Sequence, residues 1–136
     1  MNRILVPVDG SEQALRALRH AMAQAEEIHI VNVQRKADTP ALLMHMTQHD
    51  IDRVQREHGH SMLVSARQLL DAAGRRYRAH VLIGEPAPCI VDTARAEGAD
   101  AIVMGTRGMG ALANMALGST ATKVVHLAEL PVTLIK

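Results

Sequence analysis

Short apolar runs alternate with longer amphipathic segments along the whole chain. The runs have the length of buried strands, and the segments between them repeat apolar residues at helical spacing. This alternation predicts an α/β fold, with a single open parallel sheet of five strands and helices on both faces. The five expected strands are Arg3 to Val8, Ile28 to Val33, Tyr77 to Ile83, Ala101 to Met104 and Val132 to Ile135.

Four amphipathic segments are predicted to form the helices. Ser11 and Ser119 are the expected N-caps of the first and last helices, and Gly74 is expected to end the second. The polar connection from Gln34 to about Gln48 is expected to be disordered and to carry no chemistry. The helices are expected from Ser11 to Ala25, from Ile51 to Ala73, from Pro86 to about Gly98, and from Ser119 to just before Pro131.

Size and composition narrow the class of protein. The 136 residues fit one domain, and 15 basic against 14 acidic residues give a net charge of +1. This balance provides no broad electrostatic footprint for nucleic acid or an anionic membrane, so neither partner is expected. No apolar stretch approaches the roughly 20 residues that span a bilayer, and the N-terminus shows no secretory leader. We therefore expect a soluble, cytoplasmic protein.

Two glycine-containing segments in the second half of the chain predict a phosphate site. Gly105 and Gly108 lie directly after the fourth predicted strand, where a missing Cβ lets backbone amides approach a ligand closely. Gly118 and Ser119 begin the last helix, whose free N-terminal amides and partial positive charge favour an anion. Arg107 lies in the first of these segments, between Gly105 and Gly108, and is either a phosphate ligand or an ordinary solvated arginine.

Other phosphate-binding and nucleotide-binding motifs fit less well. The chain has no Gly-4x-Gly-Lys-Ser/Thr loop, which excludes a Walker A site. Gly108 to Ala113 match a dinucleotide fingerprint, but they lie late in the chain, and Glu129 precedes the next strand rather than ending it. We regard that match as coincidental. Tyr77 is the only aromatic residue, which argues against a flavodoxin, and Asp9 lacks the second acid of a phosphoacceptor receiver.

The histidines and the single cysteine are interpreted as structural. Four of the eight histidines gather in one segment: His45, His49, His58 and His60. No carboxylate or thiol completes a recognisable metal-ligand set there, and a solvated helix face explains them equally well, so no metal ligands are predicted. His80 and His126 are interpreted as isolated, structural residues. Cys89 is expected to be a small packed hydrophobe rather than a reactive thiol.

The glycine segments follow the pattern Gly-2x-Gly-9x-Gly-Ser/Thr, and here the chain resembles the universal stress protein family, specifically its ATP-binding branch. The resemblance covers nearly the whole chain, so residues 1–136 are expected to form one universal stress protein domain. It implies a Rossmann-like sheet of strand order 3-2-1-4-5, in which Asp9 and Gly105 meet at a topological switch point. The other matching fragments, in order, are Ile4 to Ser11, Gly84 to Pro86, Gly98 to Gly105 and Pro131 to Ile135.

The resemblance also implies a site for ATP. Asp9 would accept hydrogen bonds from ribose or adenine and could share a Mg²⁺ with the triphosphate, and Val33 would pack on adenine. From the residues alone, the alternatives are that Asp9 belongs to a turn leading to a helix cap, and that Val33 and Met104 are ordinary core residues. The residues that the resemblance places at the nucleotide are Pro7, Val8, Asp9, Val33, Met104, Gly105, Arg107, Gly108, Gly118, Ser119, Thr120 and Ala121.

One departure from the family pattern bears on affinity. A hydroxyl residue often stands three positions after the glycine of the second segment, where this chain has Ala121, with Thr120 one position earlier. Contacts by Ser119 and backbone amides survive this change, whereas tight triphosphate binding is less expected.

The expected function is that of a nucleotide-binding regulatory module of the stress response. Asp9 is the only acid at the expected site, and no set of nucleophile, base and orienting group emerges, so at most slow ATP turnover is expected. The alternative is an interaction module of the same fold that binds no nucleotide. The apolar last strand lies at a sheet edge, which favours a homodimer through that strand, as the family commonly forms.

Overall fold

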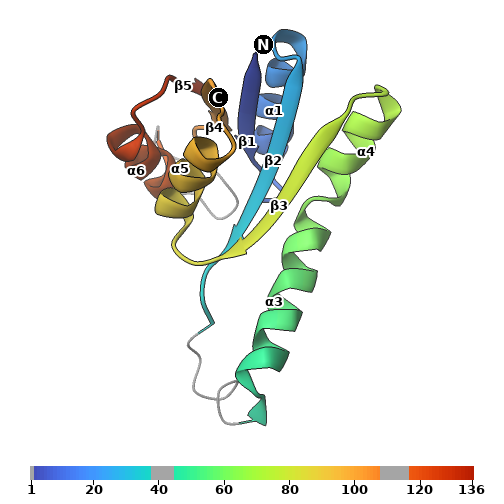
Figure 1. Ribbon diagram of the computed structural model, residues 1–136, viewed down its shortest axis with the longest axis vertical. Helices are drawn as coiled ribbons and strands as arrows, with labels where there is room; N and C mark the ends of the chain where they lie inside the picture. Colours follow the sequence, from blue (N-terminus) through green and yellow to red (C-terminus); the bar gives the residue numbers. More distant parts are fainter. Residues whose placement is uncertain (1, 38–44, 108–116) are drawn as a thin grey trace.

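A five-stranded parallel sheet forms the centre of the molecule (Figure 1). The computed structural model describes residues 2–37, 45–107 and 117–136. The strand order is β3-β2-β1-β4-β5 and all four pairings are parallel, which confirms the predicted fold class and the order implied by the resemblance. The strands are β1 (Arg3–Pro7), β2 (Glu27–Gln34), β3 (Tyr77–Ile83), β4 (Ala101–Gly105) and β5 (Val132–Ile135).

Helices cover both faces of the sheet and create two separate core layers. On one face, Leu18 of α1 and Leu70 of α4 pack with Ile30 of β2. On the other face, Ile90 of α5 and Val124 of α6 pack with Leu5 of β1. Because the central strands are buried on both sides, they appear in the sequence as nearly continuous apolar runs. The helices are α1 (Glu12–Gln24), α3 (Gln48–Met62), α4 (Val64–Ala72), α5 (Pro86–Ala96) and α6 (Ser119–Leu127).

The single helix predicted from Ile51 to Ala73 is wrong, because the structure has two helices that meet at Leu63. The backbone amide of Leu63 donates to the carbonyl oxygen of His60 at 3.1 Å, a tighter turn than the helical bond to the fourth preceding residue. At this turn the Leu63 side chain is fully buried in the layer that contains α1 and α4. The amino-terminal part of α3 extends beyond the sheet (Figure 1).

The predicted N-caps are half right. Ser11 caps α1, since its hydroxyl oxygen accepts a hydrogen bond from the Ala14 amide at 3.2 Å. The cap of α6 is Gly118 and not Ser119, which is the first helical residue. Gly118 has extended backbone angles while its carbonyl oxygen already accepts the first helical bond, from the Thr122 amide at 3.0 Å.

The polar connection that was expected to be disordered is described only at its ends. Gln34 belongs to β2 and Gln48 begins α3, whereas residues 38–44 lie outside the described residues. Residues 108–113, which match a dinucleotide fingerprint, also lie outside them. In the described part of the chain, no helix combines the length and apolar character needed to cross a membrane.

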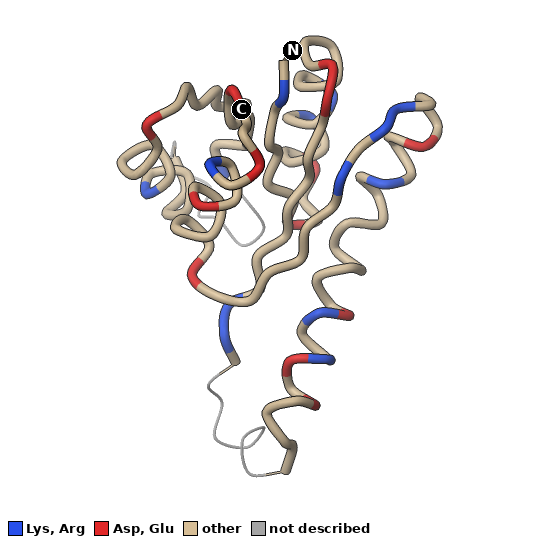
Figure 2. The backbone as a smooth tube through the Cα atoms, viewed as in Figure 1, with Lys and Arg blue, Asp and Glu red and all other residues tan. Residues whose placement is uncertain are grey.

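Charged residues of both signs are interspersed along the described chain, most visibly along α3 (Figure 2). In α3, Arg53 lies 4.0 Å from the carboxylate of Asp50 and 3.3 Å from that of Glu57. Exposed pairs of this kind contribute little to stability. Their consequence is electrostatic, because neighbouring opposite charges prevent α3 from presenting a face of one sign.

Candidate functional site

A pocket of about 480 Å³ lies at the carboxyl ends of β1 and β4. These two strands are neighbours in the sheet, yet β1 leads into α1 on one face and the chain after β4 returns as α6 on the other. This divergence makes the position a topological switch point, where open parallel sheets bind ligands.

Every predicted site residue that the structure describes lines this pocket. Gly108 lies outside the described residues. The residues brought together are Pro7, Val8, Asp9, Val33, Met104, Gly105, Arg107, Gly118, Ser119, Thr120 and Ala121. Sequence reasoning missed further lining residues, namely Ser11, Ala14, Val31, Asn32, Arg35, Pro86, Ile90 and Thr106. Most of these missed residues lie close in the sequence to predicted site residues or to the Gly84 to Pro86 fragment, and this proximity was the signal that could have identified them.

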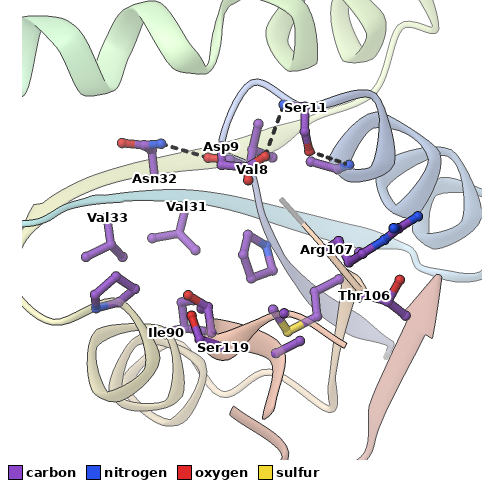
Figure 3. Close-up of a pocket in the computed structure, with 18 of the residues that line it drawn as sticks. Val8, Asp9, Ser11, Val31, Asn32, Val33, Ile90, Thr106, Arg107 and Ser119 are labelled. Carbon is purple, nitrogen blue, oxygen red and sulfur yellow. Dashed lines mark hydrogen bonds between the residues drawn. The ribbon is translucent and has the colours of Figure 1, made fainter. Parts of the chain in front are cut away.

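One side of the pocket is apolar. Val31, Val33 and Ile90 present their side chains there, from β2 and α5 (Figure 3). Val31 and Ile90 are buried, whereas Val33 is half-buried and therefore retains surface that a ligand could cover. This side suits a flat apolar group such as a heteroaromatic ring.

The other side of the pocket consists largely of backbone. The Gly118 amide donates to the carbonyl oxygen of Thr106 at 2.5 Å, which joins the start of α6 to the end of β4. A Cβ atom on Gly118 would lie only 3.2 Å from that oxygen, and one on Gly105 would lie 3.0 Å from the Cβ of Gln13. Neither glycine has a positive φ, so glycine is favoured at both positions by the close approach of neighbouring atoms and not by the backbone conformation.

The amino terminus of α6 opens into this backbone side without a side-chain cap. Ser11 and Thr47 cap α1 and α3 through their hydroxyls, but Gly118 has no side chain to do so. Ser119 is exposed and Thr120 half-buried, and both line the pocket, so two hydroxyls stand beside the first amides of the helix. Helix N-terminal amides without a cap favour an anionic ligand.

Ala121 and Met104 lie at the boundary between the pocket and the core. Ala121 is 2% exposed and Met104 5% exposed, and both pack in the α5 and α6 layer while also lining the pocket. The Thr122 hydroxyl donates to the Gly118 carbonyl oxygen at 2.9 Å, which directs it to the helix backbone. The hydroxyls of this segment that line the pocket are therefore those of Ser119 and Thr120.

Asp9 is both a turn residue and a pocket residue. Its carboxylate accepts a hydrogen bond from the Ser11 amide at 3.0 Å, so the turn interpretation is correct (Figure 3). The side chain is nevertheless exposed at the pocket. The turn is supported from β2, where the buried Asn32 amide donates to the Val8 carbonyl oxygen at 2.8 Å.

Two arginines line the pocket. The Arg107 amide donates to the Gln13 side-chain oxygen at 2.8 Å, and the residue is half-buried rather than fully solvated. The Arg35 guanidinium pairs with the Glu85 carboxylate at 3.0 Å, and both side chains are mostly exposed. Among the described lining residues Asp9 is the only carboxylate, and no histidine, cysteine or lysine is included. The ionisable side chains of the described lining are therefore one carboxylate and two guanidinium groups.

The structure agrees with the interpretation of Cys89 as a packed residue but not with that of His80 as an isolated one. Burial, and then the charges of Asp92 and Glu85, raise the pKa of the Cys89 thiol, which agrees with a packed hydrophobe. His126 is exposed. The description of His80 as isolated is wrong, because its Nε2 lies 3.0 Å from Nδ1 of the buried His29. Burial lowers the pKa of His80.

The chain is similar to known proteins over its full length. The universal stress protein YxiE of Bacillus subtilis is 32% identical over 146 residues, with 99% of each chain covered. A universal stress protein of Thermus aquaticus is 36% identical over 135 residues, with 98% of this chain and 97% of the relative covered.

Solved structures agree with these sequence relationships. Hypothetical protein MJ0577 of Methanocaldococcus jannaschii superposes with a TM-score of 0.85 at 27% identity, covering 99% of this chain and 95% of the other. The universal stress protein of Archaeoglobus fulgidus in complex with dAMP has a TM-score of 0.71 at 28% identity, covering 100% and 98%. Because the sequence model of the universal stress protein family also matches residues 1–136, this chain belongs to that family.

Proposed function

We propose that the pocket binds an adenine nucleotide and that the protein is a nucleotide-dependent regulatory module of the stress response. The observation that carries the proposal is the glycine-capped N-terminus of α6, which opens into a pocket at the switch point together with Asp9. The dAMP complex of the Archaeoglobus fulgidus relative supports it, since dAMP contains both an adenine ring and a phosphate.

The two sides of the pocket match the two ends of a nucleotide. The adenine ring would lie against Val31, Val33 and Ile90, where burying a flat ring gains hydrophobic free energy. The phosphates would lie at the backbone side, at the α6 amides and the Ser119 hydroxyl. Between them Asp9 would accept hydrogen bonds from the ribose hydroxyls.

We infer ATP as the nucleotide, with at most slow turnover. A triphosphate would bring more charge to the α6 terminus and to Arg107 than a monophosphate does, and Mg²⁺ would be shared between its oxygens and Asp9. The described lining offers no general base to activate water, because Asp9 is its single carboxylate and already accepts from the Ser11 amide. Binding rather than hydrolysis would then set the state of the protein.

A second candidate is an interaction module of the same fold that binds no nucleotide. It is favoured by Ala121, which fills core space and supplies no hydroxyl at a position where the family often has one. In that case the glycines at 105 and 118 would serve only the close approach of β4, α1 and α6.

We also propose a homodimer through β5. This strand pairs with β4 on one side only, and no other strand of the described residues pairs with its outer side. The unpaired N–H and C=O groups on the outer side of this four-residue strand can form hydrogen bonds with a strand of a second copy. Antiparallel pairing of two β5 strands would extend the sheet across a two-fold axis.

Calorimetric titration of the nucleotide-stripped protein with ATP, with and without Mg²⁺, tests the binding proposal. Gly118→Val should weaken ATP binding at least tenfold, because its side chain would press on Thr106 and obstruct the α6 amides. Ser119→Ala should weaken it less, by the about 0.5–1.5 kcal/mol of one hydrogen bond. Ala96→Val, on an exposed position of α5, is the matched control that adds bulk away from the pocket.

The outcomes separate the two candidates. Saturable binding that Gly118→Val removes and Ala96→Val preserves would support the nucleotide module, and titration with ADP and AMP would then rank the phosphates. A folded wild-type protein that binds none of the three nucleotides would refute the proposal and favour the interaction module.

A further inference from the structure

A second cluster of ligating side chains lies outside the nucleotide pocket. It consists of His29 on β2, His80 on β3 and Glu97 directly after α5, whose ligating atoms all lie within 4.8 Å of one another. None of the three lines the pocket. His29 is fully buried, while His80 and Glu97 are half-buried, so the cluster reaches the surface on one side.

The strand register creates this cluster. Val31 is paired with His80, and His29 lies two residues before Val31 on the same face of β2, so the two histidines are diagonal neighbours on one face. That face is the one covered by α5, since Val31 packs in the same layer as Ile90. Glu97 directly follows the last turn of α5, and its carboxylate completes the cluster from the α5 side of the sheet.

The two imidazole rings face each other through nitrogen atoms. Nδ1 of His29 and Nε2 of His80 are 3.0 Å apart, the ring centroids are 5.3 Å apart, and the planes differ by 10°. The distance between the centroids equals the distance between the nitrogens plus one radius of each ring. The two rings therefore lie edge to edge, with the two nitrogens on the line that joins the centroids. Only one proton fits between such nitrogens, so at least one lone pair is directed into the cluster. Glu97 brings a carboxylate oxygen to 4.0 Å from the same His29 nitrogen.

Glu27 sets which nitrogen of His29 carries the lone pair. The Glu27 carboxylate lies 3.0 Å from Nε2 of His29, and a carboxylate accepts, so Nε2 holds a proton and Nδ1 is available as a ligand. Arg3 in turn holds the second oxygen of Glu27 at 2.8 Å. A carboxylate behind the histidine, on the side away from the ligand, is the usual second layer of a protein metal site.

We infer that His29 Nδ1, His80 Nε2 and the Glu97 carboxylate form a binding site for one transition-metal dication, with Zn²⁺ as the best match. Two imidazoles and one carboxylate are a Zn²⁺ ligand set that leaves a fourth position for water. In a tetrahedral Zn²⁺ site with ordinary bond lengths, the two nitrogens would be roughly 3.3 Å apart. His29 directs its Nδ1 lone pair along the line to His80 Nε2, so the His80 side chain has to swing Nε2 off that line, and its Nε2 proton has to leave, before an ion can bind both nitrogens.

The charges around the cluster are compatible with a dication. Arg3 and Arg78 are the cations near it, and the carboxylates of Glu27 and Glu97 offset them. Arg3 is already engaged, with Glu27 and with the Glu97 carbonyl oxygen at 2.6 Å. The half-buried His80 and Glu97 can adjust to an ion, whereas His29 is held in place by burial and by Glu27.

Histidines of α3 are the competing location for a metal. His49 and His60 line a surface pocket together with Asp52, Arg53, Arg56 and Glu57. Its two guanidinium groups offset its two carboxylates, both histidines are exposed, and the ligating atoms there do not gather as those of His29, His80 and Glu97 do. A His49→Gln and His60→Gln double variant is therefore the matched control for the proposed site.

The test is titration of Zn²⁺, and of Co²⁺ as a visible-absorbing probe, into untagged, chelator-treated full-length protein. We expect one ion per chain and intense Co²⁺ absorption typical of four-coordinate geometry. His80→Gln should weaken Zn²⁺ binding at least about tenfold, and Glu27→Gln, which removes only the supporting carboxylate, by about ten- to a hundredfold. The double variant on α3 should bind like wild type.

The comparison of variants decides the outcome. His80 is half-buried, so His80→Gln is expected to fold, and circular dichroism with thermal unfolding checks this for every variant. Unchanged Zn²⁺ affinity in folded His80→Gln, loss of affinity in the α3 double variant, or no Zn²⁺ binding by wild type would each overturn the inference.

Discussion

The side-chain amide of Asn32, on β2, donates a hydrogen bond at 2.8 Å to the backbone carbonyl oxygen of Val8, which directly follows the middle strand β1. Asn32 is 4% exposed and also accepts from the Gln34 side chain at 2.8 Å. The bond fixes the segment from which Asp9 projects into the pocket. A buried polar group thus supports the functional site from behind.

Removal of this support should affect both stability and binding. Asn32→Ala leaves the Val8 carbonyl oxygen without its donor, so the free energy of unfolding should fall by about 1–3 kcal/mol. ATP affinity should fall as well, because the Asp9 turn is no longer held. Urea denaturation and calorimetry measure the two effects. Asn2→Ala is the control, since that exposed amide donates to the Gln24 carbonyl oxygen far from the pocket. If Asn2→Ala lowered the free energy of unfolding and the ATP affinity as much as Asn32→Ala does, the supporting role assigned to Asn32 would be wrong.

Gly59 should be intolerant of alanine although it lies inside α3. Alanine is normally favoured over glycine in a helix by about 1 kcal/mol. Here the added Cβ would lie 2.5 Å from Cγ1 of Val81 and 3.1 Å from the side-chain oxygen of Asn32. Gly59→Ala should therefore lower the free energy of unfolding by about 1–3 kcal/mol, as measured by urea denaturation.

The control for Gly59 is a substitution on an exposed helical surface. Ser65→Ala in α4 should change stability by less than about 0.5 kcal/mol. A Gly59→Ala protein at least as stable as wild type would show that β3 can move away from α3, and would contradict the prediction.

The Cys89 thiol should react slowly in the native protein. Burial raises its pKa, so at neutral to mildly alkaline pH less of it is thiolate than in an unfolded chain, and the thiolate is the nucleophile. Native protein should therefore react with a disulfide reagent more slowly than protein unfolded in urea, and its rate should keep rising at a pH where the unfolded rate has levelled off.

The same shift has a consequence for stability. Above the pKa of an unfolded cysteine the unfolded chain loses this proton first, so the free energy of unfolding should fall as pH rises through that range. Cys89→Ser, whose hydroxyl does not titrate there, should lack this part of the pH dependence. Native Cys89 reacting faster than the unfolded thiol would refute the argument.

The β5 edge predicts the oligomeric state. Sedimentation at micromolar concentration should give about twice the chain mass of 14.7 kDa. Thr133→Lys should shift the protein toward monomer, because antiparallel pairing about a two-fold axis brings the two copies of this exposed residue close together. Ser65→Lys adds the same charge on α4 and should leave the dimer intact. A monomeric wild type would refute the dimer.

The sequence predicted the sheet well because its signal is local. Val6 and Val103 are buried in apolar runs that need no knowledge of their partners to be identified as strands. The glycines of the pocket were likewise identifiable, since loss of a Cβ after a strand or before a helix is a local feature. The N-cap of α6 was predicted one position too late, at Ser119 instead of Gly118. Both glycine and serine are common N-cap residues, so only the backbone angles distinguish the two assignments.

The relationships that the sequence did not predict depend on register. Asn32 and Val8 are 24 residues apart, and His29 and His80 are 51 apart, so each contact exists only once the strands are aligned. A polar residue within an apolar run gives no indication of its partner. Gly59 was missed for the same reason, because the close approach of α3 to Val81 is a property of packing and not of the helix.

The backbone construction of one side of the pocket has a consequence for how this protein can vary. Groups contributed by the main chain at Thr106, Gly118 and the first turn of α6 are present whatever side chains surround them. Random substitution therefore has few ways to delete these main-chain groups and more ways to cover them, since a residue larger than glycine at position 118 places a Cβ atom only 3.2 Å from the Thr106 carbonyl oxygen. Loss of ligand recognition among descendants of this chain should arise through gain of bulk, so a survey of inactive variants should find enlarged glycines far more often than truncated polar residues.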